Sequence, residues 1–144
     1  MLDQINIEYY SIKETDNIHI VNNDAHTIVV CRESDLTTES KDLLNKMLTA
    51  VKLSDAQINT LAIADQQSFH LSQVLGASVA RTILVFGYSP SEVALSADIS
   101  KYRPIRIGKD RIVFSDSLST LITQPALKKP LWASLQHLYL QAEN

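Results

Sequence analysis

Glycine is scarce in this sequence, with three in 144 residues, at positions 76, 87 and 108. Loops that cradle phosphates need several glycines within a few residues, because the backbone must approach the phosphate closely and often adopts positive φ. The two nearest glycines here are eleven positions apart. This spacing excludes a Walker loop and a dinucleotide-binding fingerprint.

Cysteine and long hydrophobic runs are also scarce. Cys31 is the single cysteine, so an internal disulfide is excluded, and a lone thiol fits a reducing compartment. No apolar stretch resembles a signal peptide or approaches membrane-spanning length, and none of the four histidines lies in a recognisable metal-ligand motif. We therefore expect a cytoplasmic protein with no membrane contact, no metal and no cofactor.

The net charge of −3 is small but unevenly distributed. Residues 1–65 hold eleven acids and five bases, whereas residues 66–144 hold five acids and eight bases. A nucleic-acid-binding domain normally carries a stronger basic excess. Five of the bases form a cluster in eleven residues: Lys101, Arg103, Arg106, Lys109 and Arg111. This cluster could meet phosphates or an acidic partner, or be the solvated side of a hairpin, so direct DNA contact stays open.

Apolar runs alternate with amphipathic segments along the chain. Runs typical of buried strands occupy 26–32, 58–64 and 82–87, and a hairpin is indicated by 103–107 and 111–114 around Gly108. We expect helices at 38–53, 67–77, as one turn at 90–95, and from 117 onward with an interruption at Pro125 or Pro130. Thr38 or Ser40 could cap the first of them. The order predicts an α/β fold, a small three-layer sandwich with a mostly parallel central sheet of about four strands flanked by helices.

Three groups of residues are candidates for catalysis. Ser89 in Gly87-Tyr88-Ser89-Pro90-Ser91 resembles a nucleophile elbow, but the second glycine is missing, and a helix cap before proline is the simpler interpretation. Cys31 ends an apolar strand and fits a buried structural thiol. Asp110 and Asp116 flank the last strand as paired carboxylates or ordinary turn residues. No catalytic set is assigned. The alternative is a small α/β hydrolase or glycosylase-like enzyme that uses Ser89, Asp110 or Asp116.

The N-terminal segment, residues 1–17, is apolar at helical spacing, with Leu2, Ile5, Tyr9 and Ile12 on one face and Ile7 and Tyr10 beside them. It either packs on the core of its own domain or folds onto the groove of a partner. We expect it to be a partner-binding segment that precedes a single α/β domain at residues 18–144.

Three stretches together resemble the psi subunit family of bacterial DNA polymerase III, the small accessory proteins of the clamp loader. The N-terminal pattern matches at Leu2, Gln4, Ile5, Ile7 and Ile12, with Tyr10 where tryptophan is usual. The second stretch is the strand at 28–30, followed by Ser34-Asp35-Leu36 and the helix at 43–48. The third is the tail, with Val113, Phe114, Leu118, Leu121, Pro125 and the pair Leu131-Trp132.

The resemblance implies a non-catalytic adaptor with a small α/β sandwich fold. Such a protein forms a heterodimer with the chi subunit through its globular domain, and chi contacts the single-stranded-DNA-binding protein. The N-terminal segment binds the clamp-loader ATPase subunits (gamma/tau). The expected clamp-loader-binding residues are Leu2, Gln4, Ile5, Ile7, Tyr10 and Ile12. An exposed apolar patch on the domain is expected to bind chi.

Overall fold

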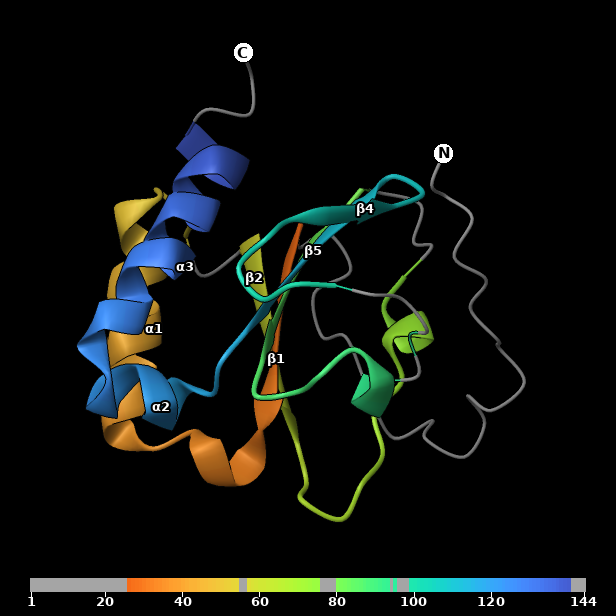
Figure 1. Cartoon of the computed structure of the whole chain (residues 1–144), viewed down its shortest axis with the longest axis horizontal. Coiled ribbons are helices and arrows are strands. Elements are labelled where there is room, and N and C mark those ends of the chain that lie inside the picture. Colours follow the sequence, from red (N-terminus) through yellow and green to blue (C-terminus); the bar gives the residue numbers. More distant parts are fainter. Residues whose placement is uncertain (1–25, 55–56, 76–79, 94, 96–98, 141–144) are drawn as a thin grey trace.

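A five-stranded sheet forms the centre of the protein (Figure 1). The computed structural model describes residues 26–54, 57–75, 80–93, 95 and 99–140. The N-terminal segment, residues 1–17, lies outside these residues. The strands are β1 (Thr27–Arg32), β2 (Ile58–Ile63), β3 (Thr82–Phe86), β4 (Ile105–Ile107) and β5 (Asp110–Ser115).

The sheet has the order β2-β1-β3-β5-β4. All neighbouring strands are parallel except β4, which pairs antiparallel with β5 across the predicted hairpin. The expected α/β sandwich with a mostly parallel sheet is confirmed, with five strands where about four were expected. The apolar runs appear as predicted because parallel strands are covered on both faces, so both sets of alternate side chains are apolar.

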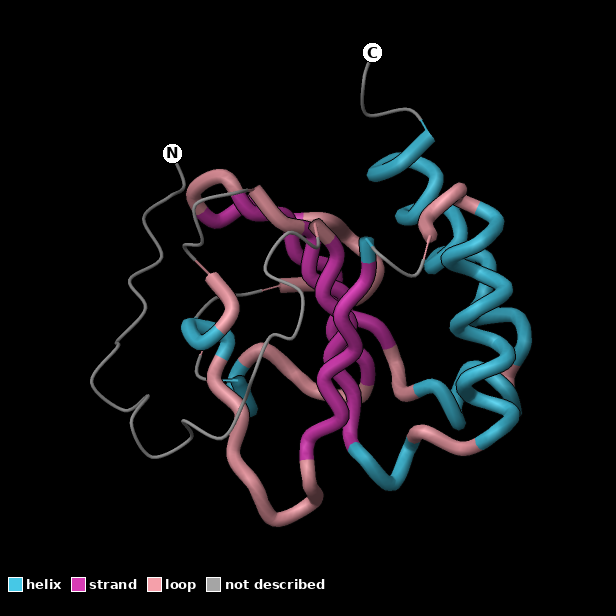
Figure 2. Tube along the Cα trace, turned by 180° about the vertical axis from the view of Figure 1, so that it is seen from behind, coloured by secondary structure: helices cyan, strands magenta, loops and turns pink. Residues whose placement is uncertain are grey.

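The two faces of the sheet are covered differently (Figure 2). On one face lie α1 (Thr38–Ala50), α2 (Leu118–Thr123) and α3 (Lys128–Leu135), which continues as a π-helical turn at Gln136–Leu140. Val29, Leu84 and Val113 point into this helical layer. The opposite face is covered, in the described part of the chain, by loops with short 3-10 turns at Leu71–Gln73 and Ser91–Val93. These three layers enclose two apolar cores, one on each side of the sheet.

Two local predictions were wrong in detail. The described part of the helix expected at 67–77, residues 67–75, is a loop with one 3-10 turn at Leu71–Gln73. Phe69, Leu71 and Val74 are buried in the same core from this loop. The cap of α1 is Thr37, whose side chain accepts a hydrogen bond from the Ser40 amide, and not Thr38 or Ser40. A hydroxyl at this position satisfies one of the amides that a helix start leaves unpaired.

Pro125 separates α2 from α3, as the sequence predicts. The residue before it, Gln124, has φ −127° and ψ 78°, outside the helical region that a following proline disfavours. Pro130 lies in the first turn of α3, where a missing amide donor costs nothing, and the helix continues through it. Leu118, Leu121, Leu131 and Leu135 are thereby buried in one core.

The chain changes direction around β1. From β1 it passes through α1 to β2 on one side, and from β2 it returns along the other face of the sheet to β3 on the far side. The carboxyl ends of β1 and β3 therefore form a topological switch point, the usual ligand-binding position of open α/β sheets. In Figure 1 these ends lie at the bottom of the molecule.

Candidate functional site

An apolar groove lies between α1 and the edge strand β2. Its volume is about 360 Å³, and it is lined by Leu36, Lys41, Leu44, Asn45, Leu48, Ile58 and Thr60. It exists because α1 does not extend over the outermost strand. Along β2, Thr60 and Ala62 on the helix side are exposed, whereas Leu61 and Ile63 on the other side are buried. Leu36, before α1, and Ile58 of β2 therefore stay half-exposed along the groove, whereas Leu44 and Leu48 of α1 are buried at its floor.

The backbone beside this groove is also open. Within the described residues β2 pairs with β1 alone. The outer edge of a strand presents a row of amide and carbonyl groups that can accept a further strand from another protein. An apolar groove next to such an edge combines side-chain and backbone binding surfaces.

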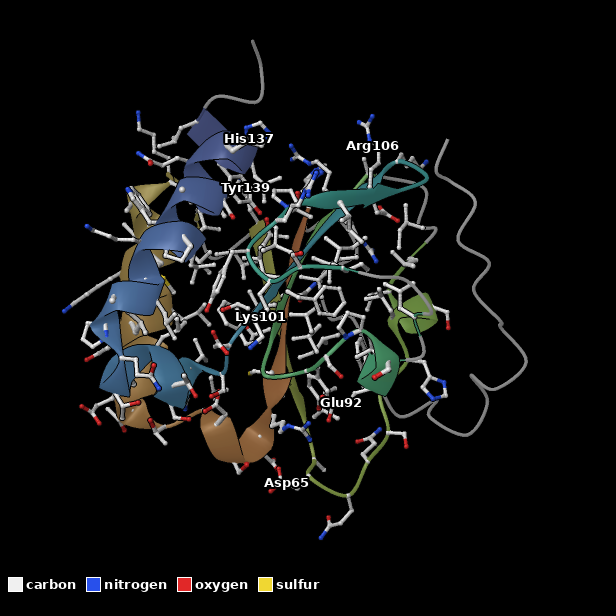
Figure 3. The ribbon with its side chains drawn as sticks, viewed as in Figure 1. Asp65, Glu92, Lys101, Arg106, His137 and Tyr139 are labelled. Carbon is white, nitrogen blue, oxygen red and sulfur yellow. The ribbon has the colours of Figure 1, made fainter. Side chains whose placement is uncertain are left out.

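A second, polar pocket lies at the carboxyl ends of β3 and β5. It has a volume of about 300 Å³, and it is lined by Gly87, Tyr88, Ser89, Glu92, Lys101, Ser115, Asp116 and Ser117. Lys101 and Glu92 are labelled in Figure 3. The Lys101 Nζ lies 2.6 Å from Asp116 Oδ1, and Glu92 accepts a 2.9 Å bond from Arg32 at the end of β1. Each charged side chain of the pocket therefore has an opposite charge beside it.

These contacts keep both carboxylates ionised. Hydrogen bonds from Ser89, with a smaller contribution from Arg32, lower the pKa of Glu92. Burial alone would raise the pKa of Asp116, but hydrogen bonds from Lys101 and Tyr102 outweigh it, and the net pKa is lowered. The Tyr102 hydroxyl donates to Asp116, and burial and this carboxylate raise the pKa of the phenol. At neutral pH the pocket is thus a set of closed ion pairs and hydrogen bonds.

The three residues of the enzymatic alternative are not brought together. Ser89 and Asp116 line the polar pocket, but Asp110 begins β5 at the opposite end of the sheet, where its buried carboxylate accepts a 2.9 Å hydrogen bond from the Arg81 amide. Ser89 acts as a cap. Its amide donates to Glu92 Oε1 at 2.7 Å, and its hydroxyl accepts from the Glu92 amide at 3.4 Å. This reciprocal arrangement is a capping box.

Cys31 is the buried thiol that the sequence predicts. Its side chain is inaccessible in the helix-side core, and burial, reinforced by the nearby Asp35 charge, raises its pKa to about 11. The thiolate is the nucleophilic form, and a thiol with such a pKa is almost entirely protonated at neutral pH.

The basic cluster is divided between the two ends of the sheet. Lys101 pairs with Asp116 at the carboxyl end, and the bases at positions 103 to 111 lie on and beside the hairpin. The clamp-loader-binding residues Leu2, Gln4, Ile5, Ile7, Tyr10 and Ile12 lie outside the described residues, and their role stays a prediction.

Sequence reasoning did not locate the groove. Its one sequence signal is the alternation within 58–63, where a threonine and an alanine occupy the positions that a covered strand would fill with larger apolar residues. Among the described residues, no three His, Cys, Asp or Glu side chains gather in a group able to hold a metal ion. The described helices include none long and apolar enough to cross a bilayer.

Comparison with family models and with curated proteins gives no match for this chain. Assignment to the psi family therefore depends on the sequence resemblance alone.

Proposed function

We propose that this chain is a non-catalytic adaptor subunit of the bacterial replicative DNA polymerase III holoenzyme, similar to psi and acting in the cytoplasm. It links the clamp-loader ATPase subunits to chi, and through chi to the single-stranded-DNA-binding protein. The observation that supports this proposal is the accessible apolar groove beside the open edge of β2.

The groove suits a protein partner better than a small substrate. Leu36 and Ile58 are half-buried along it, and Thr60 and Asn45 are exposed at its surface. Apolar side chains that stay accessible in an isolated domain gain free energy when a partner covers them, at about 25 cal/mol per Å². We assign this surface to chi, which would place apolar side chains against α1 and backbone along β2.

The N-terminal segment supplies the first attachment, and the groove supplies the second. The apolar residues at 2, 5, 7, 10 and 12 are anchors for the clamp-loader ATPase subunit, and a few such anchors carry most of the affinity of an interface. An adaptor of this design holds one partner with a short segment and the other with a domain surface.

Deletion of residues 1–14 tests the first attachment. We expect the affinity for the clamp-loader ATPase subunit to fall by at least about tenfold, equivalent to about 1.4 kcal/mol, in a titration by calorimetry. Binding to chi should be unchanged. Undiminished affinity for the ATPase subunit would contradict the assignment of the segment.

The second attachment is tested by placing charge in the groove. The double variant Asn45→Glu and Thr60→Glu changes two exposed groove residues, and Ala126→Glu with Ala133→Glu makes the same charge change at exposed positions that do not line the groove. We expect about a tenfold loss of chi affinity in the first variant and a change of less than about twofold in the second. Equal behaviour of the two variants would remove the groove from the proposal.

A small hydrolase or glycosylase-like enzyme is the second candidate, because Ser89 and Asp116 share the polar pocket at the carboxyl ends of β3 and β5, next to the switch point. Turnover of ester or glycoside substrates that disappears in both Ser89→Ala and Asp116→Asn would favour it over the adaptor. No turnover in the parent protein would leave the adaptor as the better account.

A further inference from the structure

The hairpin places two arginines directly opposite each other. In the antiparallel pairing of β4 with β5, Arg106 lies across from Arg111. Residues in such a pair share one face of the sheet, and like charges at this position are unfavourable. This face is the helical one, because Arg111 extends from β5 to the π-helical turn at the end of the chain.

Arg111 is held in place by hydrogen bonds at both tips of its guanidinium. One nitrogen donates to the Leu138 carbonyl at 3.2 Å and the other to the Thr82 hydroxyl at 3.0 Å. Both partners are neutral, so these bonds orient the positive charge without neutralising it. His137, next to Leu138, and Arg106 are exposed and lie at the same end of the molecule in Figure 3. Arg106 and Arg111 thus begin a cationic strip across β4 and β5, and His137 of the last turn lies at the same end of the molecule.

Among the described residues, no carboxylate pairs with Arg103, Arg106 or Arg111. Residues 99–140 contain two acids, Asp110 and Asp116. Asp110 is 2% exposed and bound to the Arg81 amide, and Asp116 is bound to Lys101 and Tyr102 at the other end of the sheet. The exposed Arg103 precedes β4 and extends the strip. The exposed charged side chains of this segment are therefore all basic.

We propose that the cationic strip binds the phosphodiester backbone of single-stranded nucleic acid. A guanidinium presents paired donors that match phosphate oxygens, and a nucleic acid strand supplies phosphates in series along such a strip. A protein partner draws most of its affinity from apolar or aromatic anchors, whereas the exposed members of this strip are cations. The proposal goes beyond the adaptor function and does not depend on it.

Binding of this kind is electrostatic and depends on salt. Each cation that neutralises a phosphate of a single strand contributes about −0.7 to the slope of log affinity against log salt. The three arginines of the strip therefore give a slope of about −2. The affinity of the full chain for a labelled oligothymidylate, measured by fluorescence anisotropy between about 50 and about 200 mM salt, should follow this slope.

The strip is tested by a matched pair of double variants. Arg103→Glu with Arg106→Glu reverses two exposed charges at the hairpin, and Lys46→Glu with Lys129→Glu reverses two exposed charges on α1 and α3. We expect at least about a tenfold weaker affinity and a slope reduced by about 1.4 in the hairpin variant, with less than about a threefold change in the control. The single variant Arg106→Gln should lie between the parent and the hairpin variant.

Two results would overturn the proposal. One is an equal loss of oligothymidylate affinity in the hairpin variant and the control variant, since net charge alone would then account for binding. The other is equal or tighter binding of polyglutamate than of oligothymidylate at the same salt concentration, which would assign the strip to an acidic protein segment. Urea unfolding of each variant shows that the compared proteins are equally folded.

Discussion

The two ends of the central sheet differ in how their charged side chains are paired. At the carboxyl end, Arg32 pairs with Glu92 and Lys101 pairs with Asp116, so each cation has a carboxylate within 3 Å. At the amino end, Arg106 and Arg111 face each other across the hairpin, and the nearby Asp110 is occupied by a backbone amide. The cations named at the carboxyl end are paired, whereas Arg106 and Arg111 at the amino end have no carboxylate partner among the described residues.

Charged side chains therefore contribute to stability at one end of the sheet and are left accessible to ligands at the other. Exposed ion pairs such as Lys101–Asp116 stabilise a fold by little, commonly less than about 1 kcal/mol. The stronger tie at the carboxyl end is buried Asp35, whose two oxygens accept from the Leu118 and Ser119 amides at the start of α2. At the amino end buried Asp110 makes a similar contact with the Arg81 amide, and the exposed Arg106 is left accessible to an anionic ligand.

Loss of the Asp35 carboxylate should have the largest effect on the compensated end. Asp35→Ala leaves two amides at the start of α2 without their acceptor, and we expect the free energy of unfolding in urea to fall by about 2–4 kcal/mol. Asp35→Asn keeps one acceptor oxygen and should cost less. Asp42→Ala, at an exposed position of α1, should change stability by less than about 0.5 kcal/mol. Equal effects of Asp35→Ala and Asp42→Ala would contradict the tie between the two segments.

The two described glycines with positive φ allow a direct comparison of the ends. Gly87, with φ +82°, follows β3 at the carboxyl end, where an added Cβ would lie 3.2 Å from the Ser117 Cβ. Gly108, with φ +62°, forms the hairpin turn, where an added Cβ would meet nothing within 4 Å. Both alanine variants carry a left-handed backbone cost of about 1–2 kcal/mol. We expect Gly87→Ala to be the more destabilising in thermal unfolding, because it adds a steric conflict. The opposite order would show that the carboxyl end is loosely packed.

The smallest effect is expected from Asp116→Asn. The folded pKa of Asp116 is lowered, so its contribution to stability is present at neutral pH and is lost as pH falls below about 4 toward the folded pKa. The variant should therefore lose well under about 1 kcal/mol at pH 7 and show a shallower decline of stability on acidification. Asp42→Asn, an exposed α1 variant, should keep the decline of the parent. An unchanged acid profile for Asp116→Asn would show that the Lys101 and Tyr102 contacts contribute nothing to folding.

Local sequence patterns predicted much of the fold. Every residue from Thr27 to Val30 is apolar or β-branched, and such a run predicts a strand buried on both faces. The interruption at Pro125 follows from a steric clash that involves adjacent residues alone. Residues 67–75 of the helix expected at 67–77 form a loop with one 3-10 turn, because their apolar side chains pack into the core and this long-range packing outweighs a weak helical spacing.

The candidate sites could be predicted only in part. Ser89 as a cap and Cys31 as a buried thiol depend on neighbours close in sequence or on a strand that the sequence already indicates. The groove forms because Leu48 of α1 and Ile58 of β2 lie at the edge of the sheet. Strand order puts them there, and the sequence of neither segment specifies the strand order. The cluster at 101–111 predicted a concentration of positive charge, but not that Lys101 would be neutralised and Arg106 left exposed.

The sequence alone was enough to predict most helices and strands, the α/β class and the exclusion of glycine-rich phosphate loops, because each depends on the order of neighbouring residues. The pairing of charged side chains became known from the tertiary structure. Asp35 reaches α2 across 83 positions, and Arg111 reaches Leu138 across 27. Such pairs form where packing of the apolar faces brings distant segments together. The apolar side chains drive this packing, and their pattern in the sequence does not indicate which charged side chains will meet.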